Sequence, residues 1–329
     1  MPDSSSIPEK QTVDVVKSPG PGFVDELKGF ANALPNRSIF VVLLVAWVGL
    51  FHFLGNSTFG YVDTSSIFQW MYTAYNAPDS EDGHGNLIPF VVLGLIWWKR
   101  DQLLKVNMVP WKGGFGLVVL AIVLHLLGFV AQQPRISIVA LFTGLYGIMG
   151  LCWGYSWLRT IFFPFFLFAF CVPIGSLAIE LTFPLRVLVS ELSVLTATKV
   201  FQLDVIREGT LIFDADRSFR FDVAPACSGI RSLITLFALT TIFGFVTFRS
   251  YWRRGLMMLA SVPLAVLGNI LRITTVIIVG HQYSQEMGIK IEQKLGFLTF
   301  LVAIVGIMVL SHFLAEPEPV TESKKDNNE

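Results

Sequence analysis

The sequence predicts an all-α protein that crosses a membrane about eight times. Hydrophobic residues make up 53% of its 329 residues, and charged residues only 15%. The mean hydropathy of +0.63 is too high for a chain that folds in water. The apolar residues are also collected into separate runs, most of them near the ~20 residues that a helix needs to cross a bilayer.

Each predicted span is an apolar run that stops at charged residues or at a turn. The runs are Ser38–Leu54, Leu87–Trp98, Phe115–Ala131, Ile136–Trp153, Ile161–Ile179, Ile230–Phe248, Gly255–Val279 and Leu295–Leu314. The second run is short for a span unless it continues into its flanks. We therefore predict a transmembrane domain at 37–314 between two cytoplasmic tails, 1–36 and 315–329.

The two tails differ sharply in composition from the spans. Ser, Pro, Gly and charged residues dominate 1–36, which cannot bury enough apolar area to fold alone, and 315–329 is predicted to be disordered as well. Phe23, Leu27, Phe30 and Leu34 nevertheless share one helical face. This spacing predicts a short helix that lies in the membrane interface.

Lysine and arginine are concentrated after the second, fourth and sixth predicted spans. These residues are Lys99, Arg100, Lys105, Lys112, Arg159, Arg249, Arg253 and Arg254. The loop at 55–86 contains acidic residues but no lysine or arginine. Because positive charge marks cytoplasmic loops, both chain ends are predicted to be cytoplasmic and the loops after odd-numbered spans to lie outside. Arg135, in a short outer loop, is outweighed by the other positions.

The segment at 180–226 is the longer of two predicted outer segments. Its leucines at 181, 185, 188, 192 and 195 form one helical stripe, opposed by Arg186, Ser190 and Lys199, which predicts an amphipathic helix on the outer surface. Alternating residues around Phe221 follow a turn at 214–216 and predict a small hairpin with 211–213. This hairpin would deliver the chain to the sixth span.

The run Pro-Ala-Cys-Ser-Gly-Ile-Arg-Ser at 225–232 places the thiol of Cys227 at the mouth of the sixth span. The unpaired N–H groups of a first helical turn and the nearby Arg231 both favour a thiolate, which is the nucleophilic form. Ser228 and Gly229 follow the thiol directly. The alternative for any membrane cysteine is a buried packing role. That role suits Cys152 and Cys171, since each lies inside an apolar run.

Span seven contains two polar residues, Asn269 and Arg272, three positions apart and therefore on one helical face. An arginine at mid-helix costs about 2.5 kcal/mol or more on insertion scales, so it should face a partner or a wet cavity. We expect its side chain to reach toward the outer surface, where Cys227 lies. The position of Arg272 also suits a structural ion pair or a carbonyl clamp.

Two histidines are predicted to lie on the outer side. His281 follows Gly280, which is suited to end the helix with a left-handed turn and so let His281 fold back toward Arg272. His84 lies at the start of the second span and could touch a substrate. The sequence contains no HExxH, Walker, GxSxG or Cys/His metal pattern, so we expect no metal or cofactor.

In this order, the motif around Cys227, the run Asn-Ile-Leu-Arg-Ile at 269–273 and the pair Gly280-His281 resemble the exosortase/archaeosortase family. The resemblance extends upstream to Gly-His-Gly-Asn-Leu-Ile-Pro at 83–89, which is similar to the family's His-Gly-x-Leu-x-Pro run, and so covers about 83–314. Asn86 departs from the bulkier apolar residue that members often carry. The N-terminal tail lies outside the shared pattern.

This resemblance implies a membrane-embedded cysteine endopeptidase or transpeptidase, a thiol hydrolase of the bacterial inner membrane with its active site outside the cytoplasm. Its partners would be exported proteins that end in Pro-Glu-Pro, an apolar span and a basic cluster (PEP-CTERM). Cys227 would be the nucleophile, Arg272 the cationic stabiliser and His281 the acid/base. Asn269, Ser228, Gly229, Arg231 and His84 would support the site or bind substrate. The individual substrates, the acceptor and the oligomeric state are not implied.

A transporter or export component without enzymatic activity is the competing hypothesis. In that case Asn269 and Arg272 would line a polar pathway, as intramembrane polar pairs do in carriers. The polar residues cluster toward one side of the membrane, however, and no internal repeat is visible. With a net charge of zero and no basic block, the chain gives no indication of a nucleic-acid partner.

Overall fold

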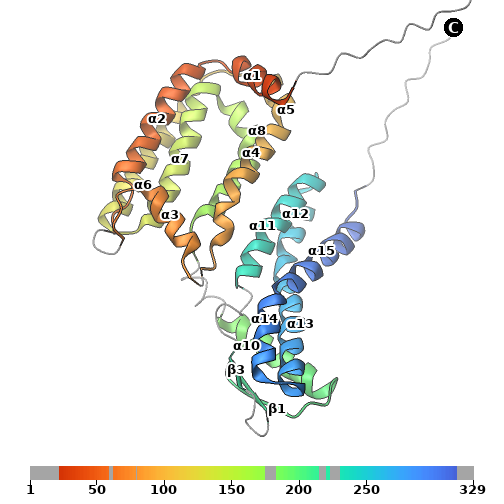
Figure 1. Cartoon of the computed structure of the whole chain (residues 1–329). Helices are drawn as coiled ribbons and strands as arrows, with labels where there is room; N and C mark the ends of the chain where they lie inside the picture. Colours follow the sequence, from red (N-terminus) through yellow and green to blue (C-terminus); the bar gives the residue numbers. More distant parts are fainter. Residues whose placement is uncertain are drawn as a thin grey trace, which may run out of the picture.

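The computed structural model describes residues 22–58, 62–78, 80–174, 183–214, 220–222 and 230–316. Within them the chain is mostly α-helical and forms two groups of helices (Figure 1). The N-terminal bundle comprises α2 (Arg37–Leu54), α3 (Ile67–Asn76), η1 (Gly83–Asn86), α4 (Ile88–Trp98), α5 (Arg100–Lys105), α6 (Gly113–Val130), α7 (Pro134–Trp153), α8 (Tyr155–Phe166) and η2 (Leu167–Cys171).

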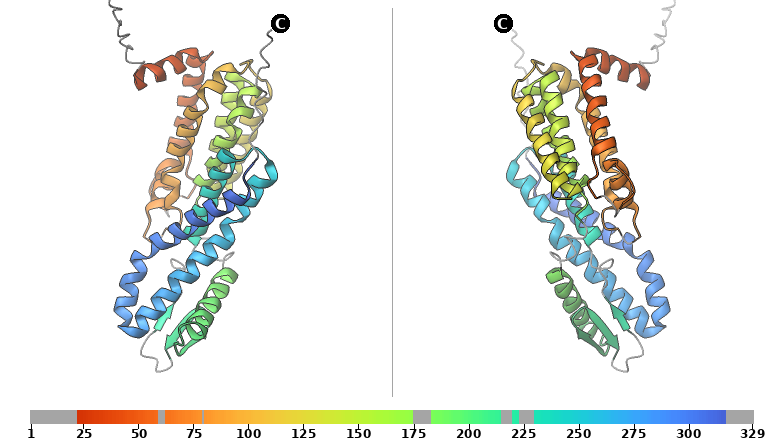
Figure 2. Two further views of the ribbon diagram at one scale, coloured as in Figure 1. Left: turned by 90° about the vertical axis from the view of Figure 1, so that its right-hand side faces the viewer. Right: turned by 90° about the vertical axis from the view of Figure 1, so that its left-hand side faces the viewer.

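The C-terminal bundle contains both helices and a small antiparallel sheet. Its elements are α10 (Phe183–Lys199), β1 (Val205–Glu208), β2 (Leu211–Asp214), β3 (Arg220–Asp222), α11 (Ile230–Thr247), α12 (Tyr251–Leu259), α13 (Ser261–Gln282), α14 (Gln285–Lys294) and α15 (Gly296–Phe313). We call α10, the strands, α14 and the second half of α13 the sheet-bearing end. Figure 2 shows this end extending beyond the N-terminal bundle.

The apolar helices of the described residues lie where the spans were predicted. Five segments are long and apolar enough to cross a membrane, namely α2, α6, α7, the continuous pair α12–α13, and α15. Three shorter apolar helices, at 88–98, 155–171 and 233–247, match the remaining predicted spans. The protein is therefore an all-α membrane protein apart from the sheet, and five of the predicted spans have the length of a full crossing.

Helix α1 (Phe23–Ala33) lies across the end of the N-terminal bundle (Figure 2). Phe23 and Phe30 both meet the ring of Trp97, at centroid distances of 5.3 and 6.1 Å. Glu26 Oε2 lies 3.4 Å from Arg100 Nη2, at the start of α5. The predicted short helix is thus present, and the exposure of Val24 and Leu27 is what a helix lying on a membrane would show.

Glycines allow α6 and α7 to pack closely. A Cβ added at Gly114 would lie 2.5 Å from the Gly147 carbonyl oxygen, and the reverse substitution would place a Cβ 2.7 Å from the Gly114 oxygen. Small residues at such crossings let helix backbones approach where lipid provides no hydrophobic drive for association. Helix α7 ends at Gly154, whose φ of 92° and 2.0 Å Cβ distance to the Val109 oxygen admit only glycine.

Helix α13 runs antiparallel to α14 and α15 along their whole length. Close approaches mark the pairing, with Gly306 beside Leu264 and Gly268 beside Thr299. Further toward the C-terminal end of α13, Gly288 of α14 lies against the α13 backbone at 276 and 280. The junction between α14 and α15, at Leu295, therefore lies level with the middle of α13.

Helix α10 and the sheet pack on the C-terminal half of α13. Their shared core consists of Val189, Ala197, Val205, Ile212, Phe221, Ile273, Val276 and Ile277. The predicted helix is confirmed, but the leucine stripe is not its buried face: Leu188 and Leu195 are 43% and 50% exposed, whereas Arg186 and Ser190 are buried. The face of α10 that contains Ser190 and Ser193 has short side chains. These allow α10 to approach α13 and the strands more closely than the bulkier leucines would.

The predicted hairpin is confirmed in its described strands. β2 pairs antiparallel with β3, with Ile212 opposite Phe221, and both side chains are buried. Strand β1 was not predicted; it pairs with the other edge of β2 and sets Val205 opposite Asp214. β2 is thus the central strand, and its last residue faces the end of α13.

Candidate active site

The predicted polar residues of span seven all lie on α13. We expected Gly280 to end this helix, and that prediction is wrong, because α13 continues to Gln282. Gly280 instead gives close contact with α14, where a Cβ added at Gly288 would lie 3.4 Å from its Cα. In an unbroken helix, His281 lies on the face opposite Arg272 and about 13 Å further along the axis. The two side chains therefore contact different parts of the structure.

His281 is paired with a carboxylate that the sequence analysis had placed only in a turn. Its Nδ1 lies 3.1 Å from Oδ1 of Asp214, the last residue of β2. The histidine side chain is 32% exposed and the aspartate side chain 11%. A carboxylate can only accept, so Nδ1 donates and the lone pair of the neutral ring lies on Nε2. Within the described part of the chain, Nε2 makes no hydrogen bond.

Arg272 is held by Glu292 of α14. One guanidinium nitrogen lies 3.4 Å from Glu292 Oε1 and 3.4 Å from the Glu292 carbonyl oxygen. Both side chains are largely buried, at 13% and 11% exposed. Of the structural alternatives stated for Arg272, the ion pair is present, and the same residue also offers its carbonyl oxygen. A span that begins at Gly296 puts this pair just beyond its end, where an arginine costs less than at mid-membrane.

Asn269 lies one helical turn before Arg272 and is 2% exposed. Neither its amide nitrogen nor its amide oxygen has a hydrogen-bond partner among the described residues. Nε of Arg272 is likewise buried without a partner in that part of the chain. Buried polar atoms of this kind are costly unless another group pairs with them, so this stretch of α13 has unused capacity to bind.

The predicted nucleophile lies outside the described residues, together with Ser228 and Gly229. Arg231 belongs to α11, but its side chain is outside the described part. In the sequence, Cys227 follows β3 by five residues and precedes α11 by three.

The family model for transmembrane exosortases (Exosortase_EpsH) matches residues 70–309, well over half of the chain. The chain belongs to the transmembrane exosortase family. No curated protein and no solved structure matches it. The match begins within α3 and ends within α15, so it leaves out α2 but includes the rest of the N-terminal bundle, the sheet and every predicted site residue of this exosortase.

His84 occupies a different part of the exosortase fold from Arg272 and His281. It lies in η1, in the N-terminal bundle, and its Nδ1 is buried without a partner among the described residues. Burial lowers the pKa of His84, against the opposing effect of nearby Asp82. No described contact joins it to α13. Its predicted role in touching a substrate stays a prediction.

Cys152 and Cys171 are free and buried, at 2% and 0% exposed, which is the packing role predicted for them. Among the described residues no three His, Cys, Asp or Glu side chains gather as metal ligands. Asp214 and Glu292 are the two site residues that the sequence analysis missed. Only the fold brings them to their partners, since Asp214 lies in β2 and Glu292 in α14, whereas His281 and Arg272 lie in α13.

Proposed function

We propose that this exosortase is a membrane-embedded cysteine endopeptidase or transpeptidase that cleaves exported proteins near a C-terminal Pro-Glu-Pro motif. The observation that carries the proposal is the 3.1 Å pair between His281 Nδ1 and Asp214 Oδ1. A nucleophile, a base and a group that orients the base form the usual set for covalent catalysis. His281 and Asp214 supply the last two, and Cys227 is the nucleophile.

In the proposed reaction, the Cys227 thiolate attacks the scissile carbonyl carbon and forms a C–S bond. The tetrahedral intermediate collapses, the C–N bond breaks, and the His281 imidazolium gives its proton to the leaving amine. A thioester remains on Cys227. Water or an amine or hydroxyl acceptor then attacks the thioester, His281 takes the proton from this nucleophile, and the thiolate is released.

Arg272 is proposed to act on the substrate side of the same region. Its guanidinium has further donors beyond those that contact Glu292, including the buried Nε. Donors of this kind stabilise an oxyanion or bind the carboxylate of a glutamate. The opposite orientation of His281 favours separate roles, with Arg272 holding the substrate or the oxyanion and His281 transferring protons.

The proposed active site lies outside the cytoplasm of a bacterial inner membrane, with both chain ends inside. The charge bias of the loops and the position of the sheet-bearing end beyond the apolar helices support this orientation. Reporters fused after Gln132 and Tyr283 are expected to read extracytoplasmic, and so is a reporter inserted after Asp214. A cytoplasmic reading at Asp214 would rule out processing of exported proteins at this site.

The transporter hypothesis is less well supported by the surroundings of span seven. A polar pathway needs its charged group to face a route through the membrane, whereas Arg272 is bound to Glu292 of α14, just before α15 begins. A histidine held by a carboxylate at a partly exposed site is expected of an acid/base and is not required of a carrier. A carrier would also tolerate serine at 227.

The proposed function is tested with a co-expressed protein that ends in Pro-Glu-Pro, an apolar span and a basic cluster. We expect the wild-type exosortase to remove this tail, which appears as a shorter product on an immunoblot. A matched substrate with Ala-Ala-Ala in place of Pro-Glu-Pro should stay intact. Equal processing of both substrates, or of neither, would contradict the proposed specificity.

A further inference from the structure

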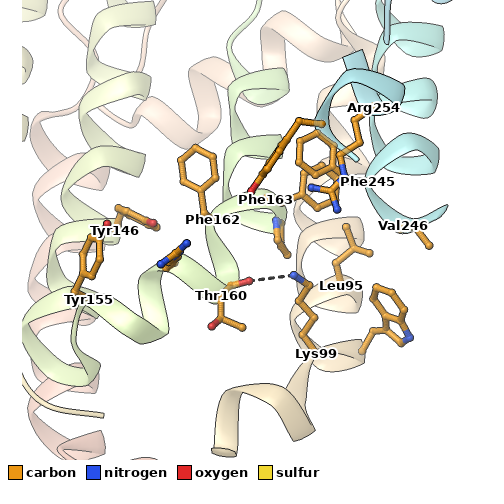
Figure 3. Close-up of a pocket in the computed structure, with 14 residues that line it drawn as sticks. Leu95, Lys99, Tyr146, Tyr155, Thr160, Phe162, Phe163, Phe245, Val246 and Arg254 are labelled. Atoms are coloured by element: carbon orange, nitrogen blue, oxygen red, sulfur yellow. Dashed lines mark hydrogen bonds between the residues drawn. The ribbon is translucent and has the colours of Figure 1, made fainter. Parts of the chain in front are cut away.

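A second candidate site lies at the opposite end of the continuous pair α12–α13 from Arg272. There, a cavity of about 710 Å³ opens between α4, α8, α11 and α12. Figure 3 shows its lining, with Lys99 and Leu95 on one wall and Phe245 and Arg254 on another. Three of the lining residues are cations, and none is an aspartate or glutamate. We call this space the basic cavity.

The three cations of the basic cavity have no carboxylate partner in the described part of the chain. Lys99 Nζ donates to the Thr160 carbonyl oxygen at 3.1 Å. Arg254 Nε donates to the Phe248 carbonyl oxygen at 2.7 Å, and its guanidinium stacks on Phe245 at 4.7 Å. Arg159 is exposed and makes no hydrogen bond or ion pair among the described residues. The cavity therefore has positive charge that nothing described neutralises.

Lys99 and Arg254 are close enough to repel each other. Burial, and then the charge of Arg254, lower the pKa of Lys99, which lies in the turn between α4 and α5. Gathering like charges around a partly enclosed space costs free energy, and an anion placed between them would offset that cost. The lining of the basic cavity therefore favours a negatively charged ligand.

The remainder of the lining is apolar and aromatic. Leu95, Phe162, Phe163 and Val246 form apolar walls. Trp98, Tyr155 and Tyr251 also line the cavity and are 59%, 57% and 82% exposed. Exposed Trp and Tyr of this kind mark the level of lipid headgroups. A small inorganic anion would use only the cations, whereas a phospholipid would use both the cations and the apolar walls.

We propose that the basic cavity binds an anionic phospholipid, with its phosphate on Lys99, Arg159 and Arg254 and an acyl chain along the phenylalanines. Basic pockets between membrane helices bind such headgroups on the side where lysine and arginine gather. The bound lipid would bridge the two bundles, because α4 and α8 belong to one and α11 and α12 to the other. This proposal does not depend on the proposed peptidase activity.

The test is lipid binding to the purified full-length protein in neutral detergent, followed by native mass spectrometry and by the shift in melting temperature. Phosphatidylglycerol and phosphatidylcholine with the same acyl chains are compared, and inorganic phosphate is added in a third arm. We expect phosphatidylglycerol to bind at least fivefold more tightly than phosphatidylcholine. Equal binding of the two lipids would overturn the proposal, and so would full competition by millimolar phosphate, which would indicate a free-anion site.

Arg159→Gln is the most suitable variant, because the exposed Arg159 makes no described bond whose loss would unfold the chain. Each cation near the headgroup contributes about 1 kcal/mol, so the variant should weaken phosphatidylglycerol binding roughly fivefold. Arg159→Lys should largely retain it. Lys105→Gln removes an exposed cation that does not line the cavity and is the matched control. Equal losses of phosphatidylglycerol affinity in Arg159→Gln and Lys105→Gln would show that only the total surface charge matters, and would overturn the proposal.

Discussion

The two bundles use histidine in different ways. In the N-terminal bundle, His125 Nδ1 lies 3.0 Å from Ser137 Oγ, and both residues are buried, at 6% and 0% exposed. In the C-terminal bundle, the partner of His281 is the carboxylate of Asp214, and the histidine side chain is 32% exposed. The neutral hydroxyl of Ser137, buried between packed helices, serves to join α6 to α7. A charged partner at a partly open site prepares the imidazole to exchange protons.

The polar groups around α13 also differ from those of the N-terminal bundle. The charged pairs His281–Asp214 and Arg272–Glu292 connect α13 to β2 and to α14. Near them, Asn269 keeps amide atoms without described partners. In the N-terminal bundle, the buried Trp47 Nε1 donates to the Leu141 oxygen at 2.9 Å and is satisfied within the helices. Trp47 thus joins two helices of the first bundle, whereas Asn269, beside the Arg272–Glu292 pair, keeps polar atoms that remain available for binding.

The largest expected effect is that of Cys227→Ser. A hydroxyl is nearly isosteric with a thiol, so the protein should insert and fold, but serine is far harder to deprotonate. Removal of the Pro-Glu-Pro tail should fall at least a hundredfold, about 3 kcal/mol of barrier. Cys152→Ser and Cys171→Ser are the matched controls in the packed helices and should retain activity. Wild-type processing by Cys227→Ser would favour the transporter hypothesis.

The next effect comes from the pair that distinguishes the C-terminal bundle. His281→Gln removes the proton carrier and should lower the cleavage rate by about a hundredfold, within the usual range for general acid–base catalysis. Asp214→Asn leaves the ring but replaces the acceptor, so we expect a smaller loss, about tenfold, in kcat with little change in KM. Asp214→Glu should recover part of the rate. An equal loss of folded protein in all three variants would indicate a purely structural pair.

Arg272→Lys should lower the rate of substrate processing about tenfold. It keeps the charge beside Glu292 but loses the planar set of donors that can bind a carbonyl or carboxylate in two places. Glu292→Gln is the comparison variant, since it breaks the ion pair and leaves Arg272 in place. Full activity with lysine would show that charge alone matters. Full activity of an alanine variant would remove Arg272 from the site.

The smallest effect is expected in the N-terminal bundle. Ser137→Ala removes the partner of His125 and should cost about 0.6 kcal/mol of stability, a typical value for a hydrogen bond between membrane helices. The melting temperature should decrease slightly, while the processing rate per folded molecule should stay within twofold of wild type. A loss of activity comparable to that of His281→Gln would show that the two histidines do not differ in role.

The sequence predicted the features that depend on local pattern. Hydropathy located the apolar helices, the alternation around Phe221 predicted the hairpin, and the motif order indicated the family. Features that depend on contacts between distant segments were missed. Gly280 was predicted to end its helix, because the contact with Gly288 that explains a glycine at this position exists only once α14 has folded against α13. The polar face of α10 was expected to be outward because only the assembled sheet and α13 make it the buried face.

The carboxylate partners were missed for the same physical reason. Asp214 is separated by 67 residues from His281, and its position depends on β1, a strand that the alternation did not predict. Glu292 is nearer to Arg272, at 20 residues, but it meets the arginine only because α14 folds back on α13. A systematic search for acidic residues near the outer ends of spans would have suggested Glu292 and would have missed Asp214.

The most direct test of the account is detection of the thioester on Cys227. Detergent-solubilised exosortase is mixed with a Pro-Glu-Pro substrate, quenched in acid, digested and examined by mass spectrometry, with and without hydroxylamine. We predict that the peptide containing Cys227 carries the substrate fragment, that hydroxylamine removes it, and that Cys227→Ser yields no such adduct. Cleavage of the substrate with no adduct in single-turnover samples, or with the adduct on Cys152 or Cys171, would contradict thiol catalysis at the sheet-bearing end.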